Sequence, residues 1–239
     1  MTSVPIAIVG AGIGGLACAR TLQQYGRPVT VLEREPSARS RWQGGMLDLH
    51  DTGQAAIHAA GLVGEFRALA RPEGQELRGL DPVTGELVHH ERPADATMSA
   101  PEIDRGQLRG LLLDSLAAGT VRWGHPVAAV SQAGDGTARL HLDDGTSQDF
   151  ALVIGANLAM LDGTDLATAI ASHDDLDQAV RAYENPMQAR ATAAAQACAD
   201  LTATITSDTV INVDAARQHL NEKIRASAAF PHGATGLGG

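Results

Sequence analysis

The chain has 239 residues, of which 44% are hydrophobic, and a formal net charge of −10 at pH 7. This composition is typical of a globular protein with one sizeable core, and it argues against an intrinsically disordered chain. An acidic chain without a basic block also argues against nucleic-acid binding, which depends on clustered positive charge.

Cysteine usage and the N-terminal segment indicate the compartment. Cys18 and Cys198 are far apart in the sequence and lack metal-type spacing, which argues against a disulfide framework. The apolar segment 4–9 is too short to span a membrane and runs into glycines rather than a cleavage pattern. We therefore expect a cytoplasmic protein with no membrane partner.

The strongest pattern in the chain is at its N-terminus. A strand is expected over residues 5–9, a glycine-rich turn over 10–15, a helix over 16–25, and a second strand over 28–32 that ends in Glu33. The order of strand, G-x-G-x-x-G, helix, strand and acid is typical of a βαβ unit that binds a dinucleotide.

Each glycine of that motif has a physical reason. Gly10 allows the tight turn, Gly12 lets the backbone approach a pyrophosphate, and Gly15 lets helix and strand pack closely. The helix N-terminus offers N–H groups and a partial positive charge to phosphates. Glu33 is expected to accept hydrogen bonds from ribose hydroxyls. The pattern is compatible with either NAD or FAD.

Periodicity and turn residues predict the remaining elements. Helices are expected over residues 53–60, 104–117, 157–171, 172–184 and 186–201. Strands are expected over 77–80, 86–89, 120–123, 127–131, 138–142 and 150–154, the last three as a meander. A loop is expected over 34–50, and residues 202–213 are compatible with a strand. The result is an α/β fold.

Local signals set several of these boundaries. Gly61 is expected to stop the helix that precedes it. Ser172 is expected to cap the helix that follows it. Asn185 and Pro186 are expected to interrupt that helix, with Pro186 opening the next one.

Two further patterns extend the N-terminal motif. Residues 44–50 read GGMLDLH, and residues 101–109 read PEIDRGQLR at the start of a leucine-rich helix. Together with the glycine motif they cover about residues 4–156, and they resemble the flavin-dependent aromatic hydroxylase superfamily. Within it, the chain looks most like the tetracycline-inactivating monooxygenases. This resemblance, together with Arg34 directly after the acid, favours FAD over NAD.

The resemblance implies cofactors and a role for each matched residue. FAD is the implied prosthetic group, with NADPH as reductant. Arg41 matches an arginine associated with the nicotinamide nucleotide, and Asp48 and Arg105 match flavin-contacting positions. Arg109, one helical turn further, either supports Arg105 or is a surface arginine. The implied cofactor-binding residues are Gly10, Gly12, Gly15, Glu33, Arg34, Arg41, Asp48 and Arg105.

The resemblance also implies a domain organisation. Residues 1–201 are expected to form a Rossmann-like FAD/NAD(P)-binding domain with a parallel sheet, a β-meander and C-terminal helices. Within it, residues 1–156 form the βαβ core and meander and residues 157–201 the closing helices. Residues 202–239 are an extension of unassigned structure. The family's central substrate domain is missing, because segment 155–167 resembles a later motif joined directly to the strand.

Three functional hypotheses follow. The first is an FAD- and NADPH-dependent monooxygenase that hydroxylates an aromatic or polycyclic, tetracycline-like molecule. The second is a non-catalytic FAD-binding chain, or one completed by a partner or by self-association through an exposed apolar sheet face. The third, ranked last, is an NAD-linked dehydrogenase, for which the sequence offers no Tyr-x-x-x-Lys pair. Asn157 is either a contact beneath the flavin or a plain helix cap.

Overall fold

The computed structural model describes residues 5–40, 43–92, 98–133, 137–155 and 160–205. Residues 1–179 form one compact unit and residues 180–239 a second. The candidate site lies in the first unit. The domain boundary expected at residue 201 stays a prediction. None of the described helices combines the length and the apolar character needed to cross a bilayer.

A parallel sheet organises the first unit. It contains four strands in the order β11-β1-β2-β7, and every neighbouring pair is parallel. The strands are β1 (Ile6–Val9), β2 (Val29–Glu33), β7 (Val121–Trp123) and β11 (Leu152–Gly155). This confirms the expected α/β fold. Since the strands are parallel, their carboxyl ends meet at one edge, which is where open α/β sheets bind ligands.

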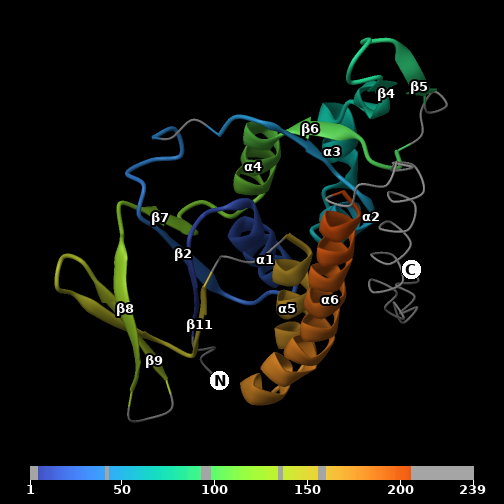
Figure 1. Cartoon of the computed structure of the whole chain (residues 1–239). Helices are drawn as coiled ribbons and strands as arrows, with labels where there is room; N and C mark the ends of the chain where they lie inside the picture. Colours follow the sequence, from blue (N-terminus) through green and yellow to red (C-terminus); the bar gives the residue numbers. More distant parts are fainter. Residues whose placement is uncertain (1–4, 41–42, 93–97, 134–136, 156–159, 206–239) are drawn as a thin grey trace, which may run out of the picture. The chain divides into compact units, whose positions relative to one another are not determined.

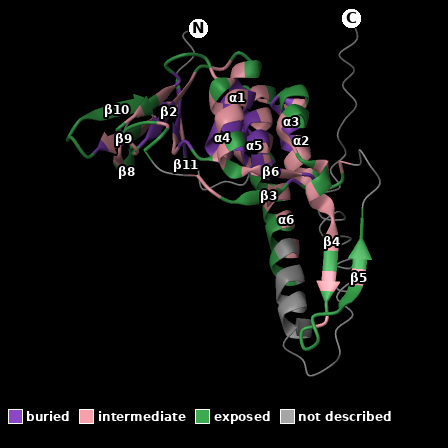
Figure 2. Cartoon of the chain, turned by 90° about the horizontal axis from the view of Figure 1, so that it is seen from above, coloured by how far each residue is buried: buried purple, intermediate pink, exposed green. Residues whose placement is uncertain are grey.

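Within the first unit, helices α1, α4 and α5 and the meander cover opposite faces of this sheet (Figures 1 and 2). Helix α1 packs against α4 and α5. The meander is a separate antiparallel sheet in the order β10-β9-β8. The helices are α1 (Ile13–Gln24), α2 (Asp51–Ala59), α3 (Val63–Leu69), the 3₁₀ turn η1 (Pro72–Gln75), α4 (Arg105–Asp114), α5 (Met160–Ser172) and α6 (Leu176–Ile205). The meander strands are β8 (Val127–Gln132), β9 (Ala138–Leu142) and β10 (Ser147–Phe150).

Apolar side chains cover both faces of the parallel sheet, one facing the meander and the other facing the helices. On the meander side, Ala7 and Leu32 of the parallel sheet pack with Leu140 and Phe150. Side chains alternate across a strand, so the completely buried Ile8 points toward the helices. The described core is therefore built mainly from aliphatic side chains, together with the buried rings of Phe66 and Phe150.

The boundary of the last meander strand was wrong. Residues 150–154 were expected to be one strand, but the chain changes sheets at Ala151. Phe150 pairs with Ala138 in the meander, whereas Leu152 pairs with Ile6 in the parallel sheet. The amide of Ala151 donates to the Pro5 carbonyl at 3.1 Å and fixes this crossover.

The expected loop over residues 34–50 contains a strand. Strand β3 (Met46–Asp48) pairs antiparallel with β6 (Glu102–Asp104), which also has no strand signal in the sequence. The two segments are far apart in the chain, so local pattern cannot reveal their pairing. Helix α3 is a further element that the sequence analysis missed.

The end of α5 and the start of α6 differ from the expected boundaries. Ser172 is the last residue of α5, and Asp175 caps α6 by accepting from the amides of Asp177 (2.8 Å) and Gln178 (3.3 Å). Helix α6 also runs without a break through Pro186. Residues 202–205 are helical rather than extended, and Asn157 and residues 206–213 lie outside the described residues.

The strands expected over residues 77–80 and 86–89 are confirmed, although the second begins one residue later and extends to Glu91. Strands β4 (Leu77–Leu80) and β5 (Leu87–Glu91) form a hairpin with a bulge. In its turn the Asp81 carboxylate accepts from the amides of Val83 and Thr84 at 2.9 and 2.7 Å. Gly85 has a φ of 74°, a conformation that favours glycine.

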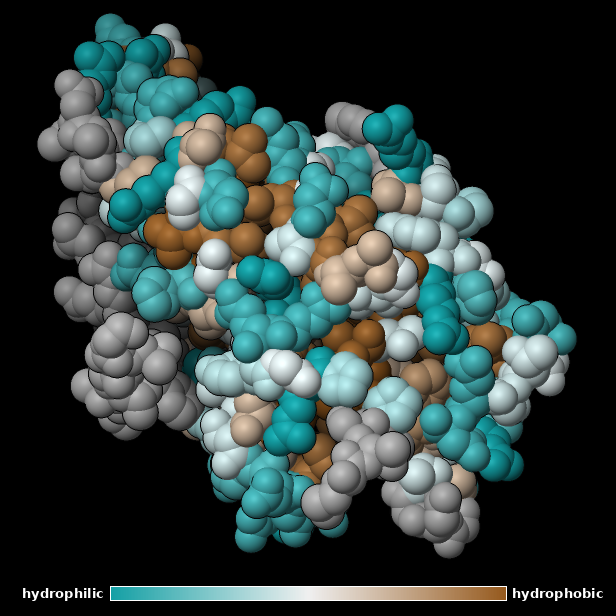
Figure 3. Space-filling model, turned by 180° about the vertical axis from the view of Figure 1, so that it is seen from behind, coloured by the Kyte–Doolittle hydropathy of each residue, from teal (hydrophilic) through white to brown (hydrophobic). Residues whose placement is uncertain are grey.

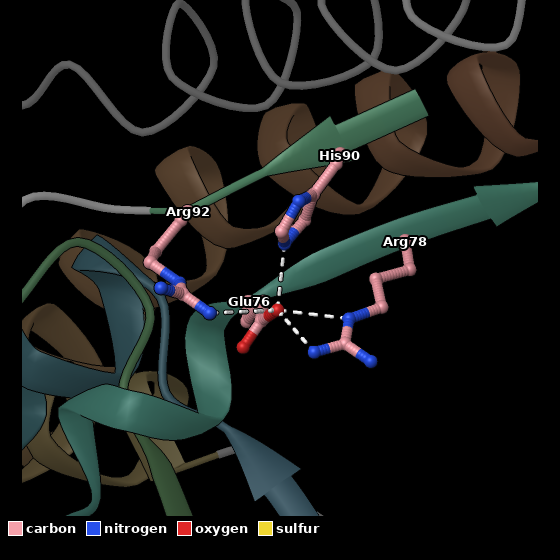
Figure 4. Close-up of polar contacts among 4 residues, drawn as sticks. All are labelled: Glu76, Arg78, His90 and Arg92. Carbon is pink, nitrogen blue, oxygen red and sulfur yellow. Dashed lines mark hydrogen bonds and ion pairs between the residues drawn. The ribbon is translucent and has the colours of Figure 1, made fainter. Parts of the chain in front are cut away.

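Charged residues gather on Glu76 at the base of this hairpin (Figure 4). Its carboxylate accepts from Arg78 Nε at 2.8 Å and contacts His90 Nε2 at 2.6 Å, and Arg92 lies 3.5 Å away. Hydrogen bonds from Arg78 first and from His90 second lower the pKa of Glu76 from 4.5 to about 2. The cluster therefore keeps its charge well below the pH at which an ordinary glutamate protonates.

Removing Arg78 is expected to raise the pKa of Glu76. Because the folded-state pKa is depressed, the cluster's contribution is present above about pH 4.5 and is lost as the pH falls toward 2. A carboxyl NMR titration of Glu76 in wild type and Arg78→Ala measures this. The exposed Arg67→Ala in α3 is the control. A wild-type Glu76 that titrates near 4.5 contradicts the cluster.

A close contact between α1 and α5 depends on Gly163. A Cβ atom built there lies 2.6 Å from the Gly14 carbonyl oxygen and 3.2 Å from Cys18 Cβ. We expect Gly163→Ala to lower the free energy of unfolding by about 2 kcal/mol through overpacking. A Cβ atom built at Gly110 in α4 would meet no protein atom within 4 Å. Gly110→Ala should therefore leave the free energy of unfolding unchanged or raise it by up to about 1 kcal/mol. Urea denaturation of both variants tests this, and equal stability of the two refutes it.

Candidate functional site

The glycine turn is tied to the neighbouring strand. Gly10 has a φ of 107°, which a side chain would disfavour, and its amide donates to the Leu32 carbonyl at 2.8 Å. Helix α1 starts three residues later, at Ile13, with Gly12 as its N-cap. The helix thus begins inside the glycine motif, three residues before the start expected from the sequence.

No contact with the described residues explains why position 12 is a glycine. A Cβ atom there would meet no protein atom within 4 Å. No side chain caps α1 at this residue. The first α1 amide with a partner within the helix is that of Leu16, which donates to Gly12 O at 2.9 Å. The preceding amides and the empty space above Gly12 suit a phosphate group.

Glu33 brings a buried negative charge to the same turn. Its Oε2 accepts from the Ala11 amide at 2.6 Å, and its Oε1 accepts from the Glu35 amide at 3.0 Å. The residue is only 9% exposed. Because each carboxylate oxygen can accept two hydrogen bonds, both oxygens retain capacity for further donors, such as ribose hydroxyls.

A cavity of about 490 Å³ opens at the carboxyl edge of the parallel sheet. Glu33 lies on its wall together with two other predicted site residues, Gly10 and Arg34. The lining residues are Val9, Gly10, Leu32, Glu33, Arg34, Glu35, His125, Pro126, Val127 and Gly155. The cavity combines apolar walls with a few polar groups, as small-molecule sites do.

The loop after β7 completes the cavity, and the sequence analysis missed it. The Gly124 amide donates to Glu35 O at 2.8 Å, and the His125 amide donates to Glu33 O at 2.9 Å. These backbone bonds hold His125 and Pro126 beside the end of β2. The sequence analysis could not find these residues, because they join the cavity only through the position of β7 next to β2. That position is a property of the sheet order and is not visible in a local sequence pattern.

Arg109 is buried, so the alternative of a surface arginine is wrong. It is 8% exposed, and its Nε donates to the Ala11 carbonyl at 2.9 Å. Its Nη1 donates to the Ala38 carbonyl at 3.1 Å, and its guanidinium lies 5.4 Å from the centre of the Trp123 ring. Arg109 therefore joins the glycine turn to the segment after β2.

Four other predicted residues are not part of the cavity lining, namely Gly12, Gly15, Asp48 and Arg105. Gly15 is buried within α1. Asp48 ends β3, and Arg105 begins α4 with its amide donating to Gly45 O at 2.9 Å. The side chains of both residues are exposed. Arg41 lies outside the described residues. The roles expected for these residues stay predictions.

Comparisons with known proteins agree with this geometry. Residues 8–68 match the family model described as an NAD(P)-binding Rossmann-like domain. Monooxygenase penA of Penicillium thymicola is 34% identical over 165 residues, which is 64% of this chain and 37% of that protein. The 3-amino-4-hydroxybenzoate 2-monooxygenase of Streptomyces cremeus is 33% identical over 160 residues, or 64% of this chain and 39% of that protein.

Solved structures share the fold. The tetracycline destructase Tet(55) superposes with a TM-score of 0.52 at 24% identity, covering 64% of this chain and 38% of that one. Klebsiella pneumoniae HpxO, complexed with FAD and uric acid, gives a TM-score of 0.53 at 22% identity, covering 63% and 38%.

The resemblance expected from the sequence is confirmed at the level of FAD-dependent monooxygenases. It extends over only part of their length, since the chain spans 37–39% of these two curated relatives. The Rossmann-like nucleotide-binding domain is confirmed as well.

Arg109 can be tested against Arg105, which is exposed on the same helix. Arg109→Met should lower the free energy of unfolding by about 2 kcal/mol, because two carbonyls lose a charged donor. Arg105→Met should change it by less than about 0.5 kcal/mol. Chemical denaturation measures both. Equal effects of the two substitutions would mean that Arg109 does not hold the glycine turn.

Proposed function

We propose that this chain binds FAD and serves as the dinucleotide-binding part of a flavin-dependent monooxygenase. One observation carries the proposal. The buried Glu33 carboxylate accepts a hydrogen bond from the Ala11 amide within the glycine turn, on the wall of the cavity at the sheet edge. A ribose acceptor and a phosphate cradle therefore adjoin each other, which is the spacing of an adenosine phosphate.

The chain's own residues supply binding and orientation. The first-turn amides of α1 would hold the pyrophosphate, with Gly12 giving the phosphates close access to the backbone. Glu33 would accept the ribose hydroxyls, and the exposed Arg34 guanidinium on the cavity wall offers a positive charge nearby. FAD itself, when bound, supplies hydride acceptance and oxygen activation.

The finer proposal concerns the reaction. It is NADPH-dependent hydroxylation of an aromatic or polycyclic small molecule, and resemblance to aromatic monooxygenases supports it. Arg41 would then serve the nicotinamide nucleotide, and Asp48 and Arg105 the flavin. An arginine beside a flavin can hold a phosphate or ribityl oxygen, or stabilise negative charge on the reduced ring.

A second candidate is an FAD-binding chain that a partner completes. One observation favours it. Apolar patches are visible between polar side chains on the face drawn in Figure 3, and Leu80, Leu87 and Val88 of the β4–β5 hairpin are more than half exposed. Such surface is typical of interaction sites. The partner would be a protein chain that supplies the substrate-facing domain, or a second copy of this chain.

Product analysis separates the two candidates. The FAD-loaded chain is incubated with NADPH and a panel of aromatic and polycyclic compounds. Substrate-dependent NADPH oxidation with a hydroxylated product supports the complete monooxygenase. Bound FAD without any hydroxylated product supports the partner-completed chain.

FAD binding itself can be tested at Gly12. Gly12→Ala introduces a Cβ that meets no protein atom within 4 Å, so the unliganded protein should fold, with a loss of about 1 kcal/mol from alanine at an N-cap. The same methyl group would obstruct a phosphate. We expect FAD affinity, measured by quenching of flavin fluorescence, to fall about tenfold or more.

Gly64 provides the matched control. It lies in the first turn of α3, and a Cβ there also meets open space. Gly64→Ala should retain wild-type FAD affinity. If Gly12→Ala binds FAD as tightly as Gly64→Ala does, the glycine turn does not hold the phosphates.

A further inference from the structure

Three adjacent strands end in a line at the cavity. The glycine turn follows β1, Glu33 ends β2, and His125 follows β7, and the sheet order makes β2 the neighbour of both other strands. Neighbouring strands are about 4.8 Å apart, so the line from β1 to β7 spans about 10 Å. This inference rests on the proposed function. If the diphosphate lies at β1 and the ribose at β2, the nucleotide base extends toward the loop after β7.

His125 has one nitrogen engaged and one available. Its Nδ1 lies 2.7 Å from the Trp123 carbonyl oxygen. A carbonyl can only accept, so Nδ1 carries the proton, and in the neutral ring Nε2 then carries a lone pair. Among the described residues, no hydrogen bond to this Nε2 is present. The local fold has therefore selected a tautomer that presents an acceptor.

The neighbours of His125 suit the flat faces of a purine. Pro126 and Val127 follow it on the cavity wall. The backbone bond from the His125 amide to Glu33 O (2.9 Å) keeps this segment beside the ribose acceptor. The ring is half-buried, so a hydrogen bond at Nε2 would be partly shielded from water.

We propose that His125 recognises the adenine base of the bound nucleotide, with Nε2 accepting a hydrogen bond from the 6-amino group. Hypoxanthine carries a carbonyl oxygen at that position. A carbonyl facing Nε2 places two acceptors against each other, and the hydrogen bond is lost. His125 is thus a specificity-determining residue that distinguishes adenine from hypoxanthine nucleotides.

Calorimetric titration of the full chain with ADP and with inosine diphosphate tests this. ADP should bind about tenfold more tightly, the value of one hydrogen bond. His125→Asn keeps an amide donor for the Trp123 carbonyl but has no atom at the Nε2 position, so it should bind the two nucleotides equally. His125→Gln places an amide oxygen near that position and should retain the preference for ADP.

The outcomes separate this inference from the proposed function. If wild type binds both nucleotides equally, or if His125→Asn keeps the preference, His125 does not recognise the base, although FAD binding stands. If the chain binds neither FAD nor ADP, the proposed function fails and this inference fails with it. Thermal unfolding of each variant without nucleotide establishes that it is folded.

Discussion

A carboxylate removed from water needs hydrogen-bond donors, and Glu33 finds one in the glycine turn. The 2.6 Å bond from the Ala11 amide joins the ends of β1 and β2 through a charged acceptor. Both parts of the candidate site depend on this bond. It fixes the carboxylate beside the first turn of α1, and it sets the shape of the turn itself.

Two other contacts hold the turn from outside the cavity. Arg109 donates to the carbonyl of Ala11, the residue whose amide binds Glu33, so both polar groups of one peptide residue are fixed. Gly163 lets α5 approach the Gly14 carbonyl. Contacts with distant segments thus position the glycine turn, while a Cβ atom at Gly12 would still meet open space. Such preorganisation lowers the ordering cost of binding a nucleotide.

The N-terminal βαβ unit could be predicted because its signals are local. A glycine with positive φ, a helix start and an acid at a strand end lie within about thirty residues. The β3–β6 pair, the position of β7 and the burial of Arg109 depend on contacts between distant segments, which single-residue patterns do not encode. Pro186 shows the opposite case. Pro186 is a strong local signal for the end of a helix, yet α6 continues through it. A proline inside a helix removes one backbone hydrogen bond, and the other hydrogen bonds of a long helix can offset this loss.

The strand order also explains why the site is larger than the glycine motif. By placing β7 next to β2, the sheet adds His125 and Pro126 to a cavity that the motif alone would leave open on one side. Residues at the carboxyl ends of neighbouring strands therefore line one cavity, at the edge where open parallel sheets bind ligands.

The most direct measurement is the visible absorption spectrum of the protein peak after incubation with FAD and gel filtration. If Glu33 and the glycine turn form an adenosine diphosphate site, flavin absorbance co-elutes with the chain in near-equimolar amount, and excess ADP displaces it. If the flavin elutes entirely as free cofactor, the chain does not hold FAD at this edge of the sheet.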